Sequence, residues 1–454
     1  MSVSLRAVVL AAGKGTRMKS TRPKVLHDLC GRAMLWYVLR ALRDAGVAHV
    51  VVVSNDELEP HVSAVAQQAG HASVQTARQE PQLGTGHAVR IALEALEPAE
   101  GTLLIVNGDM PLVDAALIRR MMQESRRVAL SLVTVRMPLP SSFGRIVRDG
   151  NRVSRIVEER DADDGERAID EMNAGLYAYD ETKLRAAVAE LRNDNAQREY
   201  YLTDTVEMLA SAGETVAPVL VEDSVLVLGV NDRVELAHAS ARLNARICER
   251  HMRAGVTIVD PHTTYLEPEL EIAADVTILP NTAIGGKSSI GQASEIGPNS
   301  RIYRTRIGRH AVVSESVVMD SEIGDYATVG PWSHVRSHSV VATGARVGNY
   351  VEIKASKLGA GVRARHLTYL GDASIGARTN VGAGTITCNF DGSKKNRTEI
   401  GEDAFIGSNS SLVAPVRVGD GALTGAGSVV IDDVPAHERV VGNPARPLRK
   451  KAPT

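Results

Sequence analysis

A period of six residues runs through the second half of the chain and restricts its fold more than any other feature. The first run of apolar residues comprises Leu266, Ile272, Ile278, Ile284, Ile290, Ile296 and Ile302. After a shift of register the period resumes from Val317 to Ile353 and returns from Ile400 to Val418, and Gly often follows the apolar residue. Seven consecutive apolar residues at one phase make chance alternation in a β-sandwich improbable. The period predicts a parallel β-helix in which each apolar residue points inward and the small residue after it lets the chain turn a corner.

The first half of the chain follows a different pattern. Short apolar runs at 8–10, 50–53 and 103–106 alternate with a helical spacing of apolar residues over 34–45. This alternation predicts right-handed βαβ units and a Rossmann-like, mostly parallel sheet, whose ligands bind beyond the carboxyl ends of the strands. Residues from 234 to 253 contain no Gly or Pro and precede Gly255, which predicts a helix. We therefore expect an α/β domain over 1–232, a helical linker over 233–253 and the β-helix over 254–454.

Composition excludes several classes of function. Aromatic residues make up only 3% of the 454 residues, so Val, Ile, Leu and Ala must fill the core, as they do in parallel sheets and solenoids. The net charge of -2 does not favour nucleic-acid binding, and no uncharged apolar run is long enough to span a membrane. The chain enters a strand pattern at once, so no signal peptide is expected. Three distant cysteines fit a reducing, cytoplasmic location rather than a disulfide framework or a zinc site.

A glycine-rich segment, residues 10–18, closes the first predicted strand. Its two glycines allow the backbone to approach a polyphosphate closely, and Lys14, Arg17 and Lys24 supply positive charge. A Rossmann fingerprint requires a third Gly where Met18 stands, and the Gly-Lys-Ser/Thr of a P-loop is absent. The segment therefore predicts a phosphate-binding loop of another kind.

Together with Pro23-Lys24, this segment resembles the sugar-nucleotide pyrophosphorylases. The resemblance implies a UTP and sugar-nucleotide site formed by Leu10, Ala11, Ala12, Gly13, Lys24, Gln79, Gly84, Thr85, Asn107, Gly108, Asp109, Gly144, Glu158, Asn173 and Asn231. It also implies that Asp109 and Asn231 hold Mg2+ and that Arg17 and Lys24 stabilise charge on the reacting phosphates. Taken singly, Asp109 could be a turn residue, Lys24 a surface lysine and Asn231 a helix cap.

Two breaks interrupt the six-residue period, at 365–372 and at 388–398, where a polar, basic loop leaves the repeat. Acetyl transfer to an amine requires a base, and His366 in the first break is the candidate. The segment from His366 to Asp372 resembles the acetyltransferase half of the bifunctional N-acetylglucosamine-1-phosphate uridylyltransferase/glucosamine-1-phosphate N-acetyltransferase family. Other histidines of the chain lack this setting, although most histidines in proteins are structural or lie on the surface.

The same resemblance assigns the remaining residues of the second site. It implies that glucosamine-1-phosphate is bound by Arg336, Lys354, Tyr369 and Asn380, and acetyl-CoA by Ala383, Asn389, Phe390, Ser408 and Ala426. Two positions depart from the family pattern, because Phe390 replaces a frequent Tyr and Asn443 replaces an Arg that contacts the CoA phosphates. Arg439, Arg446 or the tail at 449–451 are candidates to replace that Arg, and the sequence does not choose among them.

The resemblance extends over nearly the whole chain. It implies left-handed coils, a homotrimer with acetyltransferase sites between neighbouring β-helices, and acetylation of glucosamine-1-phosphate before its coupling to UTP. The product, UDP-N-acetylglucosamine, would supply peptidoglycan and lipopolysaccharide synthesis. One alternative is a pyrophosphorylase whose repeat only oligomerises, but His366 and the 388–398 loop would then have no use. A second is a non-catalytic sensor of nucleotide sugars, which would not need an intact 13–17 segment with Lys24 and Asp109.

Overall fold

The structure is a computed structural model that describes residues 5–448, and it divides into two compact units between Ala241 and Arg242. We call residues 5–241 the N-terminal unit and residues 242–448 the C-terminal unit. The long helix α8 (Arg233–Arg253) contains the boundary between them. Within residues 5–448, no helix is both long and apolar enough to cross a membrane.

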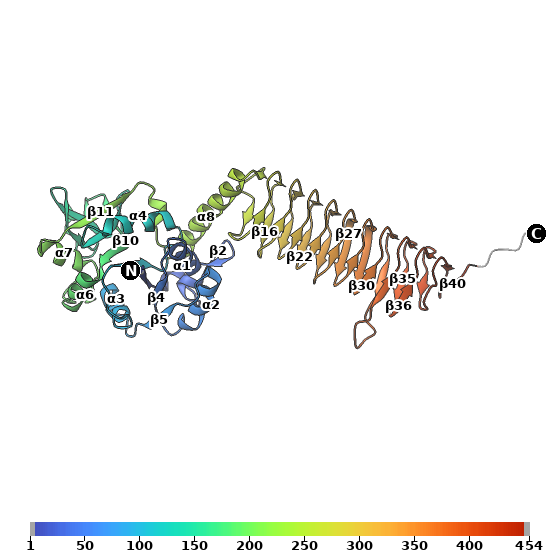
Figure 1. Ribbon diagram of the computed structural model, residues 1–454, viewed down its shortest axis with the longest axis horizontal. Helices are drawn as coiled ribbons and strands as arrows, with labels where there is room; N and C mark the ends of the chain where they lie inside the picture. Colours follow the sequence, from blue (N-terminus) through green and yellow to red (C-terminus); the bar gives the residue numbers. More distant parts are fainter. Residues whose placement is uncertain (1–4, 449–454) are drawn as a thin grey trace, which may run out of the picture. The chain divides into compact units, whose positions relative to one another are not determined.

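The N-terminal unit is built on one twisted sheet (Figure 1). Its strand order is β11 (Val216–Val221), β7 (Leu130–Arg136), β10 (Glu171–Asp180), β6 (Thr102–Asn107), β1 (Arg6–Leu10), β4 (His49–Ser54) and β5 (Gln75–Arg78). The strands from β6 to β5 are parallel, as are β7 and β11, whereas β10 runs antiparallel between β6 and β7. The prediction of a mostly parallel, Rossmann-like sheet is confirmed.

Helices flank this sheet, so its central strands are buried on both faces and consist of nearly unbroken apolar residues. The helices are α1 (Met34–Asp44), α2 (Glu59–Ala69), α3 (Thr85–Glu94), α4 (Ala115–Ser125), α5 (Asp164–Arg167), α6 (Glu181–Ala189) and α7 (Asp204–Ser211). Short elements complete the unit: η1 (Thr16–Met18), η2 (Lys24–Leu26), η3 (Ser224–Val227), the pair β2 (Asp28–Leu29) and β3 (Arg32–Ala33), and the hairpin of β8 (Arg145–Asp149) and β9 (Arg152–Val157).

The C-terminal unit is a parallel β-helix with three sides (Figure 1). Side 1 contains β12 (Thr257–Ile258), β15 (Thr277–Ile278), β18 (Glu295–Ile296), β21 (Val312–Val313), β24 (Thr328–Val329), the start of β27 (Arg346–Lys354), the start of β29 (Arg363–Gly371), β31 (Asn380–Val381), β34 (Phe405–Ile406), β37 (Leu423–Thr424) and β39 (Arg439–Val441), to which β40 (Arg446–Pro447) adds antiparallel.

Side 2 contains β13 (Tyr265–Leu266), β16 (Ala283–Gly285), β19 (Arg301–Tyr303), β22 (Val317–Met319), β25 (His334–Arg336), the ends of β27 and β29, β32 (Ile386–Cys388), β35 (Ser411–Val413) and β38 (Val429–Val430). Side 3 contains β14 (Glu271–Ile272), β17 (Ser289–Ile290), β20 (Arg306–Ile307), β23 (Glu322–Ile323), β26 (Val340–Val341), β28 (Lys357–Leu358), β30 (Ala373–Ile375), β33 (Thr398–Ile400) and β36 (Val416–Val418). The predicted left-handed β-helix of hexapeptide repeats is confirmed as the fold of this unit.

One inward position was predicted wrongly. Val318, not Val317, fills the interior of β22, since Val318 is fully buried and pairs in register with Ile302. The cause is that some sides are shorter than six residues. The spacing between successive inward residues is five from Ile302 to Ile307 and five again from Val313 to Val318. The shift of register in the sequence therefore marks sides that are one residue shorter.

The glycines that follow the inward residues also have a different role from the one expected. A Cβ added to Gly308 or Gly324 would lie 2.6 Å from a backbone nitrogen of the next coil, and neither residue has a positive φ. The corners are instead turned by other residues with positive φ, among them Asn299, Trp332 and Tyr350. Glycine is needed at 308 and 324 because adjacent coils approach closely there, not because the chain turns.

Candidate active sites

A cavity of about 620 Å³ opens where β1 and β6 end in the N-terminal unit. Its lining contains Leu10, Ala11, Ala12, Gly13, Lys24, Gln79, Gly84, Thr85, Asn107 and Asp109, all of which were proposed from the sequence. The lining also contains Lys14, Val25, Pro81, Gln82, Ala88 and Glu199. The cavity therefore lies at the carboxyl ends of parallel strands, where ligands bind in such sheets.

The start of the glycine-rich segment is held by two side chains from other loops. The carbonyl oxygen of Ala12 accepts hydrogen bonds from Asn55 Nδ2 at 3.1 Å and from Gln82 Nε2. The amide of Ala11 donates to Val53 at 2.9 Å. These bonds fix the backbone at the cavity, while Gly13 and Lys14 remain exposed to a ligand.

The loop before α3 forms the opposite wall, and its glycines are required there. Gly84 has a φ of 104° and a Cβ on it would lie 2.6 Å from the carbonyl oxygen of Tyr200. The amide of Gly86 donates to that same oxygen at 2.7 Å, and Gln79 Nε2 donates to the Gly84 carbonyl at 2.9 Å. The Tyr200 amide also donates to the Leu83 carbonyl at 2.8 Å, and these bonds bring Glu199 to the cavity, although nothing in its sequence setting indicated a role.

Three side chains proposed to act on the phosphates and metal meet at one point. Lys24 Nζ forms an ion pair with Asp109 Oδ2 and donates to Asn231 Oδ1 at 3.2 Å. The backbone of this region is closed by a bond from the Val230 amide to the Asp109 carbonyl, at 2.9 Å. Oxygens of Asp109 and Asn231 thus converge on a single cation, which here is the lysine ammonium. Carboxylate and amide oxygens are suitable ligands for Mg2+, which keeps its other positions for water and substrate phosphates.

The proposed sugar-binding residues form a second group, outside the lining of the cavity. The amide of Asn173 donates to the Gly144 carbonyl at 2.8 Å, and a Cβ on Gly144 would lie 3.5 Å from Glu158 Oε2. Burial raises the pKa of Glu158, although its Oε1 accepts a bond from the Thr203 hydroxyl at 3.0 Å. A Cβ on Gly175 would lie 2.6 Å from Asn107 Nδ2, so β10 adjoins the end of β6 here.

Arg17, Gly108 and Asn231 also lie outside the lining of the cavity. Gly108 is buried, and its amide donates to the Leu10 carbonyl at 2.8 Å. Arg17 is exposed in η1 and makes no hydrogen bond or ion pair with the described residues. The structure does not place Arg17 on the cavity.

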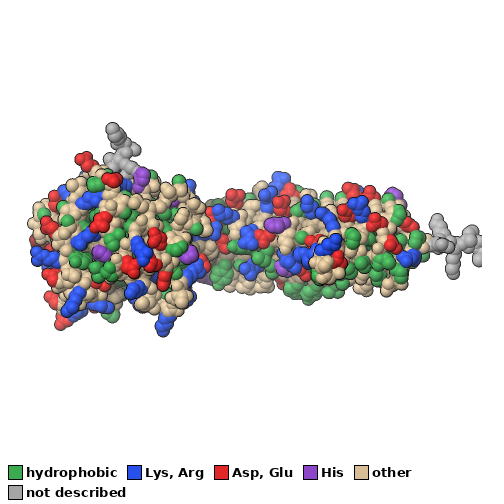
Figure 2. Space-filling model, turned by 90° about the horizontal axis from the view of Figure 1, so that it is seen from below, with side chains coloured by type: hydrophobic (Ala, Val, Ile, Leu, Met, Phe, Trp, Pro, Cys, Tyr) green, Lys and Arg blue, Asp and Glu red, His purple; other side chains and the backbone are tan. Residues whose placement is uncertain are grey.

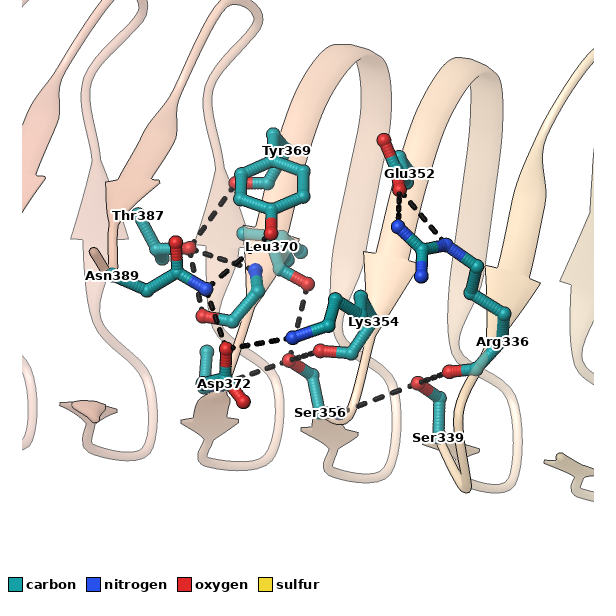
Figure 3. Close-up of polar contacts among 12 residues, drawn as sticks. Arg336, Ser339, Glu352, Lys354, Ser356, Tyr369, Leu370, Asp372, Thr387 and Asn389 are labelled. Carbon is teal, nitrogen blue, oxygen red and sulfur yellow. Dashed lines mark hydrogen bonds and ion pairs between the residues drawn. The ribbon is translucent and has the colours of Figure 1, made fainter. Parts of the chain in front are cut away.

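In the C-terminal unit, four polar residues that were proposed from the sequence lie close together on side 2 (Figure 3). Arg336 and Lys354 stand in register on neighbouring coils, and Lys354 Nζ donates to Asp372 Oδ2 at 3.1 Å. Asn389 Nδ2 donates to the same carboxylate and to the Tyr369 hydroxyl at 3.3 Å. Arg336 is paired with Glu352 at 2.6 Å. The structure thus brings together Arg336, Lys354, Tyr369 and Asn389, and it adds Asp372, to which the sequence assigned no role.

The basic loop 388–398 reaches the same place. An isolated bridge between Phe390 and Lys395 closes this loop, and Phe390 is exposed. Proximity to the Lys354 ammonium lowers the pKa of Lys395. The cations Arg336, Lys354 and Lys395 outnumber the carboxylates of Glu352 and Asp372, so this group has a net positive charge, which suits a phosphate.

His366 lies at the corner between sides 1 and 2. Its Nδ1 is 2.8 Å from Asn349 Oδ1, and the two residues stand in register on neighbouring coils. Because an amide oxygen only accepts, Nδ1 carries the hydrogen and the exposed Nε2 is left as the basic nitrogen. Sequence reasoning missed Asn349, although it stands one coil before His366.

The residues proposed for acetyl-CoA continue along this corner. The Gly384 amide donates to the Leu367 carbonyl at 3.0 Å, that of Asn409 to Ala383 at 2.7 Å and that of Gly427 to Ser408 at 2.8 Å. Ala383, Ser408 and Ala426 therefore occupy successive coils in line with His366. Asn380 does not join this group, because it lies on side 1, in register with Arg363.

The candidates to replace the missing CoA-contacting Arg are spread over the last coil. Asn443 is exposed, and Arg446 is paired with Asp432 at 3.2 Å. Arg439 is exposed, and its side chain has no partner among residues 5–448. The tail residues Arg449, Lys450 and Lys451 lie outside the described residues.

Comparisons with known proteins agree with both units. Family models match for a MobA-like NTP transferase domain over residues 7–201, a GMPPB C-terminal domain over 266–359 and bacterial transferase hexapeptide repeats over 397–432. The bifunctional protein GlmU of Staphylococcus haemolyticus is 43% identical over 432 residues, which cover 94% of this chain and 95% of the relative. The chain belongs to the GlmU family.

Two further GlmU proteins have the same relationship to the chain. That of a Geobacillus species is 42% identical and covers 98% of this chain and 96% of the relative. That of Corynebacterium efficiens is 43% identical and covers 95% of this chain and 90% of the relative. As a GlmU protein, the chain is a bifunctional transferase of UDP-N-acetylglucosamine synthesis that catalyses uridylyl transfer and acetyl transfer on small-molecule substrates. The alternatives of an inert repeat and a non-catalytic sensor are therefore set aside.

Proposed function

We propose that the cavity at the ends of β1 and β6 is the uridylyltransferase site and that the corner at His366 is the acetyltransferase site. The convergence of Asp109 and Asn231 oxygens on one cation, at the wall of a cavity with a glycine-rich loop, carries the first assignment. The hydrogen bond that leaves Nε2 of His366 free, on strand β29 whose last residue is in register with Lys354, carries the second. The uridylyltransferase domain then spans residues 1–232, the helical linker 233–253 and the acetyltransferase domain 254–454.

In the uridylyl transfer, a phosphate oxygen of N-acetylglucosamine-1-phosphate attacks the α-phosphorus of UTP and pyrophosphate leaves. Charge neutralisation governs the barrier because two polyanions must meet. When bound to Asp109 and Asn231, Mg2+ supplies that neutralisation and orients the phosphates. The amides of residues 12–15 contact the triphosphate, and Lys24 and Arg17 donate to it. Glu158 and Asn173 hold the sugar, and no covalent intermediate is needed.

In the acetyl transfer, Arg336 and Lys354 hold the phosphate of glucosamine-1-phosphate, and Tyr369 and Asn380 contact the sugar. His366 Nε2 takes the proton of the amine while the nitrogen attacks the thioester carbonyl, and CoA leaves as its thiol. Acetyl-CoA lies along the corner formed by Ala383, Ser408 and Ala426, beside Asn389 and Phe390. Acetylation precedes uridylyl transfer, since the second reaction uses the acetylated sugar phosphate.

We further propose a cytoplasmic homotrimer in which neighbouring β-helices complete each acetyltransferase site. On one chain Asn380 lies on side 1, away from Tyr369 on side 2, so a second copy must bring the two together. Large apolar residues are exposed at the corner between sides 1 and 2, where His366 lies. Among them are Trp332, Tyr350 and Leu367, which are 55%, 55% and 62% exposed. Trp332 and Tyr350 stack with ring centroids 5.4 Å apart. Apolar side chains also gather along the edge of the β-helix seen in Figure 2, and such surfaces mark interfaces.

One experiment tests both site assignments. The enzyme is incubated with glucosamine-1-phosphate, acetyl-CoA, UTP and Mg2+, and free thiol and pyrophosphate are measured separately. His366→Ala should lower thiol release about 10²–10⁴-fold while pyrophosphate release from supplied N-acetylglucosamine-1-phosphate stays near normal. Asp109→Asn should have the reverse effect. Equal loss of both activities in either variant would contradict the two-site proposal.

A further inference from the structure

A fully buried arginine lies at the entrance of the hairpin β8–β9. Only 1% of the Arg145 side chain is exposed. Its Nη2 donates to the Ser141 carbonyl at 2.8 Å and its Nη1 donates to the Phe143 carbonyl. Its charge is paired with Glu159, at 2.5 Å. One guanidinium group thus joins the loop before β8 to the segment after β9.

Arg145 and Glu159 are each the direct chain neighbour of a proposed sugar-binding residue. Gly144 precedes Arg145 and Glu158 precedes Glu159, at the open end of the hairpin, where Arg145 is in register with Val157. Gly144 packs against this segment, since a Cβ on it would lie 2.9 Å from Ile156 Cγ2. The Arg145–Glu159 pair therefore links the position of Gly144 to that of Glu158.

We infer that Arg145 is a positioning residue of the sugar pocket, which sets the distance between Gly144 and Glu158 without touching the sugar. The inference rests on the proposed assignment of Gly144, Glu158 and Asn173 to the sugar. The planar guanidinium donates from two separate nitrogens to two carbonyls and pairs its charge with a carboxylate, whereas a lysine would have to do so from a single nitrogen.

The Arg145 pair is poorly explained by stability alone. Burial of an ion pair rarely stabilises a fold more than apolar residues of similar size would. The Nε of Arg145 is also buried without a hydrogen-bond partner, which costs free energy. A strand end that needed only packing would not require this arrangement, whereas a pocket with a fixed geometry does.

The test separates binding of the two substrates. In Arg145→Met and Glu159→Gln, we expect the KM for N-acetylglucosamine-1-phosphate to rise at least tenfold while the KM for UTP changes less than threefold. Arg145→Lys should give an intermediate KM for the sugar phosphate. Acetyl transfer by the same preparations, which uses the other unit, and thermal unfolding report whether the chain is folded.

Arg148→Met is the matched control. Arg148 lies on the same strand and pairs with Glu171 at 2.7 Å, but neither residue is the direct chain neighbour of a proposed sugar-binding residue. If Arg148→Met raises the KM for the sugar phosphate as much as Arg145→Met does, or if both Arg145→Met and Glu159→Gln leave it unchanged, the inference is wrong. If Arg145→Met does not fold, Glu159→Gln decides. Glu158→Gln tests the underlying assignment: an unchanged KM for the sugar phosphate there would refute the sugar pocket itself.

Discussion

At the scale of single residues, the hydrogen bond between His366 and Asn349 determines which imidazole nitrogen is basic. Asn349→Ala removes the acceptor for Nδ1–H, so the ring can rotate and take the other tautomer. We expect kcat for acetyl transfer to fall ~10-fold, less than for His366→Ala, because the base itself remains. Steady-state measurement of thiol release checks this, and uridylyl transfer serves as the control. An unchanged kcat would mean that Asn349 does not orient the base.

Sequence reasoning found the residues that are close to a strand end or inside a recognisable motif. Asn107 ends β6 and Asp109 follows two residues later, and the glycine-rich segment begins at the last residue of β1, so local sequence was sufficient to predict their place at strand ends. Glu199 is different, because it reaches the cavity through a backbone bond from the Tyr200 amide to the Leu83 carbonyl, at 2.8 Å. A pairing between two irregular loops leaves no periodic signal in the sequence.

At the scale of elements, the contact between coils predicts which glycines are essential. In Gly324→Ala the added Cβ would lie 2.6 Å from the Thr343 nitrogen and 2.8 Å from the Ala342 carbonyl carbon. Because both atoms are backbone, the coils must separate, and we expect destabilisation of about 1–3 kcal/mol. Gly344→Asn is the control, since Gly344 has a φ of 66° and open space beyond its Cα, and Asn tolerates that conformation. Denaturant unfolding that gave equal losses for the two variants would contradict close approach as the reason.

The first turn of α7 provides a pH-dependent element. The pKa of Asp204 is raised to about 6, mainly by burial. Repulsion from neighbouring carboxylates is the second cause, and Glu158 contributes most to it. The folded chain therefore binds this proton more tightly than the unfolded chain does, whose ordinary value is 3.8. The contribution of Asp204 to stability is favourable below the unfolded value and is lost as pH rises through about 6.

Asp204→Asn should accordingly raise the unfolding midpoint of the N-terminal unit by about 2–4 °C at pH 7.5. The advantage should shrink toward zero as pH falls to 4.5, where the native carboxyl is already protonated. Thermal unfolding at several pH values measures both effects. Glu207→Gln removes one of the carboxylates that repel Asp204, so it should give a smaller gain with the same dependence on pH. A pH-independent gain in Asp204→Asn would point to packing rather than to charge.

The β-helix also defines what sequence periodicity can and cannot predict. The spacing of apolar residues gave the architecture because every coil repeats the same inward contact. It failed at Val317 because a side one residue shorter changes the register without changing the residue type. The basic loop 388–398, which separates β32 from β33, was visible in the sequence as a break in the period. Its contact with Lys354 could not be predicted, because that contact depends on how the coils stack.

At the scale of the whole molecule, the distribution of the acetyltransferase residues over two sides has a direct consequence. His366, Lys354 and Tyr369 lie at the corner and on side 2, while Asn380 faces outward from side 1 of the same chain. If the site uses all four residues, as proposed, it is complete only where side 1 of another copy approaches. Sequence alone could not predict this division, because residues on adjacent coils are interleaved along the chain.

Mixed trimers test that division. Trimers made only of His366→Ala chains, or only of Asn380→Ala chains, should have reduced acetyl transfer. When the two chains are produced together, each mixed trimer contains one interface at which an intact His366 faces an intact Asn380, so acetyl transfer should partly return. Uridylyl transfer, which needs neither residue, normalises the amount of enzyme. Co-production of His366→Ala with Asn349→Ala is the control, because Asn349 and His366 are bonded within one chain and cannot complement each other across an interface. If the Asn380 mixture recovers no more activity than this control, the site is contained in a single chain.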